Sequence, residues 1–153
     1  MSRATAFETT TAFDFTSIGS LADASVLATR GETLVHVAVA HDGIDKSGGG
    51  GFLPLVVNYR DRQYAHKRIP SAYNRRERHQ SEPEILAARV LDRCIRPLFP
   101  KGLRTTPQVT LTAHAVDGHT DPIPLSVNAA SAALLRSRYP NRHTIPFFPC
   151  QCR

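Results

Sequence analysis

The chain has 153 residues, a length that fits one domain with an ordinary hydrophobic core. Hydrophobic residues make up 41%, which argues against a disordered chain, and no apolar run is long enough to cross a bilayer. The formal net charge is +6 and the pI about 9.7. This balance favours an acidic partner without choosing between RNA, DNA and anionic lipid.

The first part of the chain is typical of a β-hairpin. Residues 1–17 are Thr-rich and predict an N-terminal arm, either loose or an added strand. Leu21–Ala28 and Thr33–Ala40 predict two strands, and Arg30, Gly31 and Glu32 between them are a turn signal. Alternation in the second strand predicts three valines on one face: Val35, Val37 and Val39.

A glycine run and a third strand follow the hairpin. Gly48–Gly51 lacks the Lys-Ser/Thr pair and the following helix of a phosphate-binding loop, so a flexible connection is the better interpretation. Phe52–Tyr59 predicts a strand. Its residues Leu55–Val57 are apolar on both faces, which predicts an interior position in the sheet.

Basic side chains gather after this strand. Between Arg60 and His79 there are seven lysines and arginines against two acidic residues. The loop Arg68–His79 carries Arg75, Arg76 and Arg78 close to Tyr73 and Asn74. Composition alone favours a solvated surface, and a contact with a polyanion is the alternative.

The most clearly signalled helix begins after Ser81. Ser81 and Glu84 have the spacing of a capping box, and Pro83 lies in the first turn, where no intrahelical N–H is lost. Pro97 ends the helix at about Arg96. Five residues at helical spacing predict a buried stripe: Ala87, Val90, Leu91, Cys94 and Ile95.

The last elements are a strand and a small-residue helix. Pro107–Val116 predicts a strand, Asp117–Pro124 a turn region, and Ser126–Leu135 a helix that packs closely on a sheet. The order of elements indicates an α+β domain with helices on one side of a mixed sheet. Residues 136–153 contain three prolines and no periodicity, and we interpret them as a divergent tail that is not native to the fold.

Cysteines and histidines do not predict a metal site. Cys94 is interpreted as a small core residue, and Cys150 and Cys152 have no second ligand pair for zinc. His114 and His119 flank a turn without helical spacing, so ordinary surface or core histidines are the better interpretation.

Several runs carry a family resemblance. They are FLPLVVNYR at Phe52–Arg60, RIP at Arg68–Pro70, RRE at Arg75–Glu77, SEPEILAARVLDRCIRPLFP at Ser81–Pro100 and ASAAL at Ala130–Leu134. In this order and spacing they resemble polynucleotide phosphorylase (polyribonucleotide nucleotidyltransferase), in the first of its two ribonuclease-PH-like cores. The resemblance covers roughly Leu21–Leu135. It implies the ribosomal-protein-S5-domain-2-like fold and makes residues 18–135 an incomplete domain of this type.

The resemblance also implies a function. Family members are phosphorolytic 3′–5′ exoribonucleases of RNA and mRNA that use Mg²⁺ and inorganic phosphate and assemble as a homotrimeric ring. Their phosphate and metal ligands lie in the second core, which has no counterpart here, so we assign no catalytic or metal residue and expect a truncated chain without catalysis of its own.

The pore loop of the family implies that Tyr73, Asn74, Arg75 and Arg76 bind single-stranded RNA. Asn74 departs from the aromatic residue that the family places there, so one stacking platform is lacking. The expected compartment is the cytoplasm, or a mitochondrion or plastid if a transit peptide precedes this sequence. The alternatives are a ribonuclease PH or exosome-ring subunit, and a non-enzymatic basic RNA-binding module.

Overall fold

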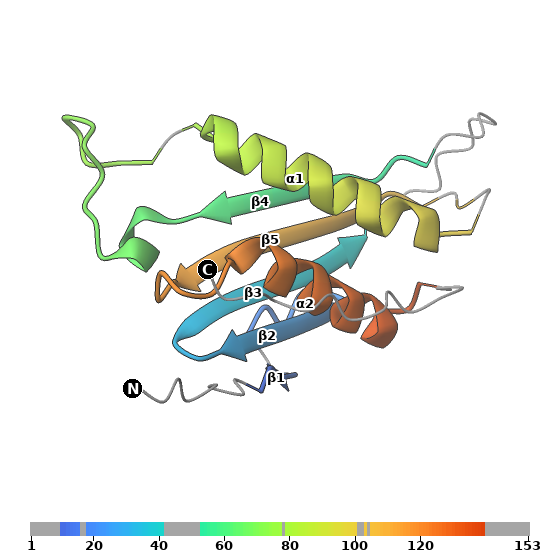
Figure 1. Cartoon of the computed structure of the whole chain (residues 1–153). Helices are drawn as coiled ribbons and strands as arrows, with labels where there is room; N and C mark the ends of the chain where they lie inside the picture. The colour runs from blue at the N-terminus through green and yellow to red at the C-terminus, as the bar shows by residue number, and fades with distance from the viewer. Residues whose placement is uncertain are drawn as a thin grey trace.

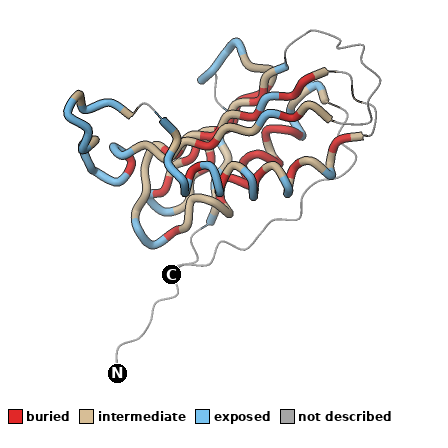
Figure 2. The backbone as a smooth tube through the Cα atoms, turned by 90° about the horizontal axis from the view of Figure 1, so that it is seen from above, coloured by how far each residue is buried: buried red, intermediate tan, exposed pale blue. Residues whose placement is uncertain are grey.

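The computed structural model describes residues 10–15, 18–41, 53–77, 79–100, 103 and 105–139. A five-stranded sheet in the order β1-β2-β3-β5-β4 carries two helices on one face (Figure 1). From above, buried residues lie where helices and strands face each other (Figure 2). The elements are β1 Ala12–Asp14, β2 Ala24–Arg30, β3 Thr33–His41, β4 Val56–Asp61, the 3₁₀ turn η1 Gln63–His66, α1 Glu82–Ile95, the 3₁₀ turn η2 Arg96–Leu98, β5 Pro107–Ala115 and α2 Pro122–Arg136. The predicted α+β class is confirmed.

The predicted hairpin forms from β2 and β3. Arg30 pairs with Thr33, so the turn has two residues, and Gly31 takes the left-handed conformation with φ +59° that such a turn requires. β2 begins at Ala24 rather than Leu21, whose side chain is fully exposed. The three predicted valines of β3 are buried on the helix-covered face, as expected from the alternation. The arm contributes β1, which pairs with β2.

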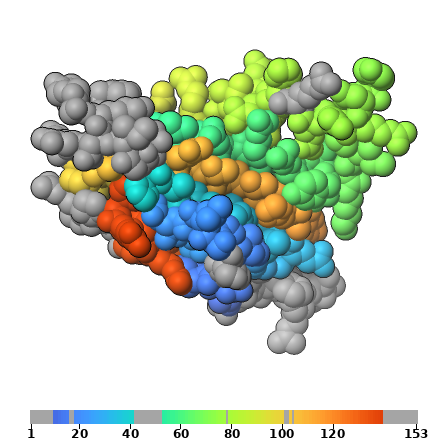
Figure 3. Space-filling model, turned by 180° about the vertical axis from the view of Figure 1, so that it is seen from behind, coloured from blue at the N-terminus to red at the C-terminus, as the bar shows by residue number. Residues whose placement is uncertain are grey.

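The interior position predicted for the third strand is wrong. β4 begins at Val56 and pairs only with β5, in parallel, so within the described part of the chain it forms an edge of the sheet. Its apolar residues are explained by α1 instead of a second neighbouring strand. Leu55 and Tyr59 are buried in the core, whereas Val56 on the other face is 42% exposed. From behind, β3, β5 and β4 run across the face opposite the helices (Figure 3).

The helix α1 has the predicted start and stop. The capping box of Ser81 and Glu84 is present, and Pro97 lies in η2, directly after the helix. Leu91 and Ile95 are fully buried, and Cys94 packs at the margin of the core, as expected. Val90, predicted to be buried, is 49% exposed. The helix rests on the sheet along one narrow row, with Glu84, Ala87, Leu91 and Ile95 facing inward, and the position before Leu91 turns outward.

The helix α2 begins four residues earlier than predicted. Asp121 caps it, accepting a hydrogen bond from the backbone N–H of Ile123 at 3.0 Å, and prolines occupy positions 122 and 124 of the first turn. The sequence pattern predicts these prolines in a turn. In the structure they occupy the first turn of the helix, where an N–H group would have no intrahelical partner. The expected turn is therefore confined to the residues around Gly118, which has φ +80°. Small side chains bury α2 against β2 and β3.

The described chain continues past α2 to Tyr139. The ring of Tyr139 packs edge-on against Phe99, with 5.8 Å between ring centroids, and its hydroxyl donates to the carbonyl of Ala40 at 3.4 Å. The remaining residues of the expected tail lie outside the described residues, as do Gly48–Gly51 and Arg78. No helix in the described ranges has the length and apolar character needed to cross a membrane.

Candidate nucleic-acid interface

The basic loop projects from the body of the molecule at the end of β4 (Figure 1, green at the left). It leaves η1 through Lys67, whose φ of +58° is left-handed and whose N–H closes the turn onto Gln63 and Tyr64 carbonyls. It returns to the body at Ser81, the first capping residue of α1. Both ends of the loop are thus fixed by regular elements that the sheet supports.

Glu77 fastens the returning half of the loop to its outgoing half. Its carboxylate accepts hydrogen bonds from the Gln63 backbone N–H at 2.5 Å and from Arg62 Nη1 at 2.9 Å. Burial acts to raise the pKa of Glu77, but these two hydrogen bonds and the charges of Arg62 and Arg60 outweigh it and lower the pKa below its ordinary value. Glu77 is therefore ionised at neutral pH and neutralises Arg62, leaving the arginines of the tip uncompensated.

The tip of the loop is a tight turn. The backbone N–H of Arg75 donates to the carbonyl of Ala72 at 2.7 Å, and Arg75 has φ +50°. Asn74 Oδ1 accepts from the N–H of Arg76 at 3.3 Å. The family resemblance gave Asn74 only as a departure from an aromatic residue. In the structure its side chain helps to hold the backbone of the turn.

The tip presents one ring and two cations to solvent. Tyr73 is fully exposed, and Arg75 and Arg76 are exposed as well. Neither arginine forms an ion pair with any residue that the structure describes. The four residues predicted from the sequence are thus brought together on one turn. Guanidinium groups without an acid partner can pair with phosphates, and an exposed phenol ring can stack on a base.

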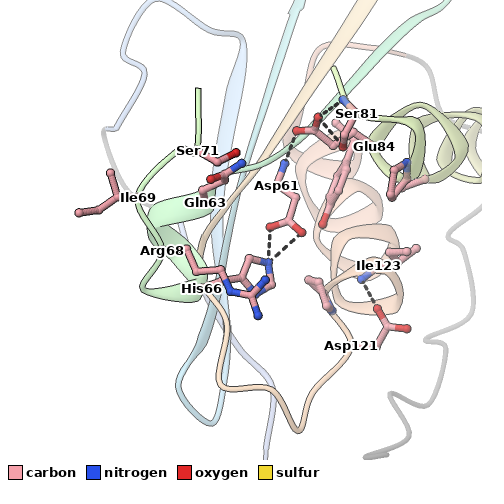
Figure 4. Close-up of a pocket in the computed structure, with 14 residues that line it drawn as sticks. Asp61, Gln63, His66, Arg68, Ile69, Ser71, Ser81, Glu84, Asp121 and Ile123 are labelled. Carbon is pink, nitrogen blue, oxygen red and sulfur yellow. Dashed lines mark hydrogen bonds and ion pairs between the residues drawn. The ribbon is translucent and has the colours of Figure 1, made fainter. Parts of the chain in front are cut away.

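A pocket of about 600 Å³ lies at the base of this loop (Figure 4). It is bounded by the end of β4, by η1, by the start of the loop and by the first turns of α1 and α2. Its lining comprises Tyr59, Asp61, Gln63, His66, Arg68, Ile69, Ser71, Ser81, Pro83, Glu84, Ala87, Asp121, Pro122 and Ile123. The sequence did not indicate this pocket, because its walls come from segments that are far apart in the chain.

Three carboxylates lie around the pocket. Glu84 is buried and accepts hydrogen bonds from the Asp61 N–H at 2.8 Å, the Ser81 N–H at 2.6 Å and the Ser81 hydroxyl at 2.9 Å. Asp61 also accepts from His66 Nε2, at 2.9 Å to each of its oxygens. Asp121 caps α2. Figure 4 shows Asp61 and His66 together in the centre of the site.

Tyr59 lines the same pocket and has an unsatisfied hydroxyl. Its side chain is 2% exposed, and its hydroxyl has no hydrogen-bond partner among the described residues. Burial first, and then the charges of Asp61, Asp121 and Glu84, raises the pKa of the phenol. Tyr59 therefore stays protonated and offers a free O–H.

The described residues do not supply a metal site. No group of three or more histidine, cysteine, aspartate or glutamate side chains within them is arranged to hold an ion. His114 accepts or donates a hydrogen bond at Nδ1 to the Tyr64 hydroxyl at 2.7 Å, as expected of an ordinary histidine.

Comparison with known proteins decides the family. Residues 13–140 match the model of the 3′ exoribonuclease family, domain 1. The chain belongs to this family. It is 41% identical over 123 residues to a polyribonucleotide nucleotidyltransferase of Elusimicrobium minutum, covering 80% of this chain and 18% of that protein. It is 48% identical over 119 residues to a protein of the same name from Methylorubrum extorquens, covering 78% and 16%. The chain thus spans less than a fifth of the length of these relatives.

Solved structures support the same family fold. The crystal structure of rice (Oryza sativa) Rrp46 superposes with a TM-score of 0.66 at 18% identity, covering 89% of this chain and 59% of that one. The Archaeoglobus fulgidus exosome with RNA bound to the active site gives a TM-score of 0.61 at 24% identity, covering 86% and 53%. At these identities the likeness concerns the fold alone. The predicted ribonuclease-PH-like core is confirmed, and the match extends beyond the expected Leu21–Leu135 at both ends.

Proposed function

We propose that this chain is part of a phosphorolytic 3′–5′ exoribonuclease of RNA and mRNA, a polyribonucleotide nucleotidyltransferase, in which it binds single-stranded RNA. The observation that carries the proposal is the loop tip, where Tyr73, Arg75 and Arg76 are exposed on a turn that Glu77 fastens to the fold. The identity of 41–48% to proteins of that name supports this choice over a ribonuclease PH or exosome-ring subunit.

The loop recognises the strand without reading its sequence. Arg75 and Arg76 pair with backbone phosphates and release counterions, a contribution that every RNA sequence shares. Tyr73 stacks on a base, which is worth roughly 1–3 kcal/mol and tolerates any base. Asn74 contributes by holding the turn, since its side chain bonds to the Arg76 backbone. Such sequence-tolerant binding suits an enzyme that shortens strands one nucleotide at a time.

Catalysis needs more of the protein than this chain supplies. In the proposed enzyme, Mg²⁺ and inorganic phosphate act at ligands outside these 153 residues, and a homotrimeric ring places three RNA-binding loops together. The described carboxylates near the loop are engaged by His66, by Ser81 and by the capped end of α2. The cytoplasm stays the expected compartment.

The loop is tested by replacing both arginines of the tip. The variant Arg75→Ala/Arg76→Ala is compared with the unmodified chain for binding to single-stranded RNA oligomers at several salt concentrations. Losing two phosphate contacts should make the negative slope of log K against log salt shallower by about 1.4, whatever the RNA sequence. The control is Arg136→Ala/Arg138→Ala, which removes the same charge from exposed arginines around the C-terminal end of α2.

The control separates specific contacts from overall charge. If both double variants make the negative salt slope shallower by the same amount, net charge rather than the loop governs binding. An unchanged slope in the loop variant contradicts the proposed function.

A further inference from the structure

We propose that the pocket at the base of the loop binds the base of a ribonucleotide and prefers bases with an exocyclic amino group over uracil. This inference deepens the proposed function and rests on it for the class of ligand. It assigns a role to Tyr59, Asp61 and Asp121, which the RNA contacts of the loop tip do not use.

The size and lining of the pocket suit a nucleotide. A volume of about 600 Å³ lies within the range of small-molecule sites. Ile69, Pro83, Pro122 and Ile123 provide apolar surface for a flat ring, and the polar groups converge from several walls.

The helix ends that line the pocket offer few free N–H groups to an anion. Helix N-termini commonly bind phosphate through free backbone N–H groups. In α2, Pro122 and Pro124 have no N–H, and the N–H of Ile123 is taken by Asp121. In α1, Pro83 lacks an N–H and Glu84 places its carboxylate at the helix start. We therefore place the phosphate at Arg68, an exposed cation that lines the pocket, and the base against the groups of β4 and α2.

The inner groups accept hydrogen bonds from a base amino group. Asp121 uses one carboxylate oxygen for its cap, which leaves the other, and each Asp61 oxygen keeps a lone pair beside the His66 contact. The Tyr59 hydroxyl has no partner and supplies a donor for a ring nitrogen or a carbonyl. On the same edge, cytosine offers two N–H donors at N4 and an acceptor at N3, whereas uracil offers one donor at N3 and a carbonyl oxygen at C4. A site with several carboxylate oxygens and one O–H donor therefore pairs more fully with cytosine.

The pocket is continuous with the RNA-binding loop. Arg68, Ile69 and Ser71 line it and belong to the segment that leads to the tip at Tyr73. A strand whose phosphates lie on Arg75 and Arg76 therefore has a nucleotide within reach of the pocket. The same chemistry would also accept a free nucleotide, and the experiment separates these two sources.

The first measurement is a calorimetric titration of the full chain with CMP and with UMP. We expect CMP to bind at least about tenfold more tightly, because CMP offers two N–H donors at C4 and an acceptor at N3, whereas UMP offers one donor at N3 and a C4 carbonyl oxygen that the carboxylates repel. Equal affinities, or no binding of either at millimolar concentration, overturn the inference. These outcomes leave the proposed function standing, since that function is tested with RNA oligomers and the arginines of the tip.

Two variants connect the preference to named groups. Tyr59→Phe should weaken CMP binding several-fold without lowering the urea midpoint, because the hydroxyl has no partner to lose.

Asp121→Asn should bring the ratio of CMP affinity to UMP affinity towards one, because an amide can donate to the uracil carbonyl. Asparagine caps helices as well as aspartate does, so the fold is retained. Asp14→Asn, the same substitution on exposed β1 at the far edge of the sheet, should leave the ratio unchanged. An effect of Asp14→Asn as large as that of Asp121→Asn contradicts the assignment.

The source of the nucleotide is decided with oligomers. A preference for oligocytidylate over oligouridylate by a similar factor assigns the pocket to a residue of the strand. A preference for CMP over UMP without any preference between the oligomers assigns it to a free nucleotide. Tyr59→Phe that leaves CMP affinity intact overturns the site in either case.

Discussion

Glu84 joins three parts of the structure, and its removal should be costly. Its carboxylate accepts from the backbone of Asp61 at the end of β4 and from both donors of Ser81 at the start of α1. In Glu84→Ala the Asp61 N–H loses a charged partner, a loss of about 1.5–3 kcal/mol. Loss of the capping box adds about 1 kcal/mol. The Ser81 hydroxyl is exposed and regains water, so it adds little.

The free energy of unfolding should therefore fall by about 3 kcal/mol in Glu84→Ala. Urea denaturation followed by helix circular dichroism measures it: with a slope of about 2 kcal/mol/M, the midpoint should fall by about 1.5 M at an unchanged slope. Glu84→Gln keeps one acceptor oxygen and should lose roughly half as much. The control is Glu82→Ala, an exposed acid of the same helix turn, which should cost less than about 0.5 kcal/mol. Equal losses in Glu84→Ala and Glu82→Ala would refute the reasoning.

Two further outcomes are expected. Burial, and then the charge of His114, holds the pKa of His36 below 6.5 against the opposing hydrogen bond to the Ile18 backbone. The unfolded chain therefore takes up the proton first, so stability should fall as the pH is lowered from about 7 through 6.5, and His36→Asn should flatten this part of a urea-midpoint profile. The purified chain with RNA, Mg²⁺ and phosphate should release no nucleoside diphosphate above a mock preparation, and release above that background would contradict the expectation that this chain has no catalysis of its own.

Local signals in the sequence predicted the elements that local chemistry determines. The hairpin follows from the alternating valines and from Gly31, because a two-residue turn needs a left-handed backbone conformation that glycine adopts readily. The start of α1 follows from Ser81 and Glu84, which meet because three residues of helix bring them together. The predicted basic loop also exists, and three of the four tip residues that the family resemblance implied, Tyr73, Arg75 and Arg76, are exposed.

Features that depend on distant segments were missed. Val90 fits the apolar stripe of α1, but which side of the helix is covered depends on the sheet beneath it. The apolar β4 suggested two strand neighbours, whereas a helix covers one face and β5 pairs along one edge. The prolines before Ser126 resemble a turn unless Asp121 is recognised as a helix cap. The pocket could not be predicted because its walls come from β4, the basic loop and the starts of α1 and α2, which only the folded chain brings together.

The mixed direction of the strands has a consequence for the order of folding. The β2–β3 hairpin closes across two residues, whereas Val39 of β3 meets Val109 of β5 only after a loop of about 70 residues has closed. β4 then joins in parallel through the α1 crossover, so its pairing also waits for β5. During synthesis on a ribosome the hairpin can form early, while β4 and the basic loop stay without their neighbour until residue 115 has emerged. The end of the domain that carries the proposed RNA-binding loop is therefore assembled only after β5 has emerged.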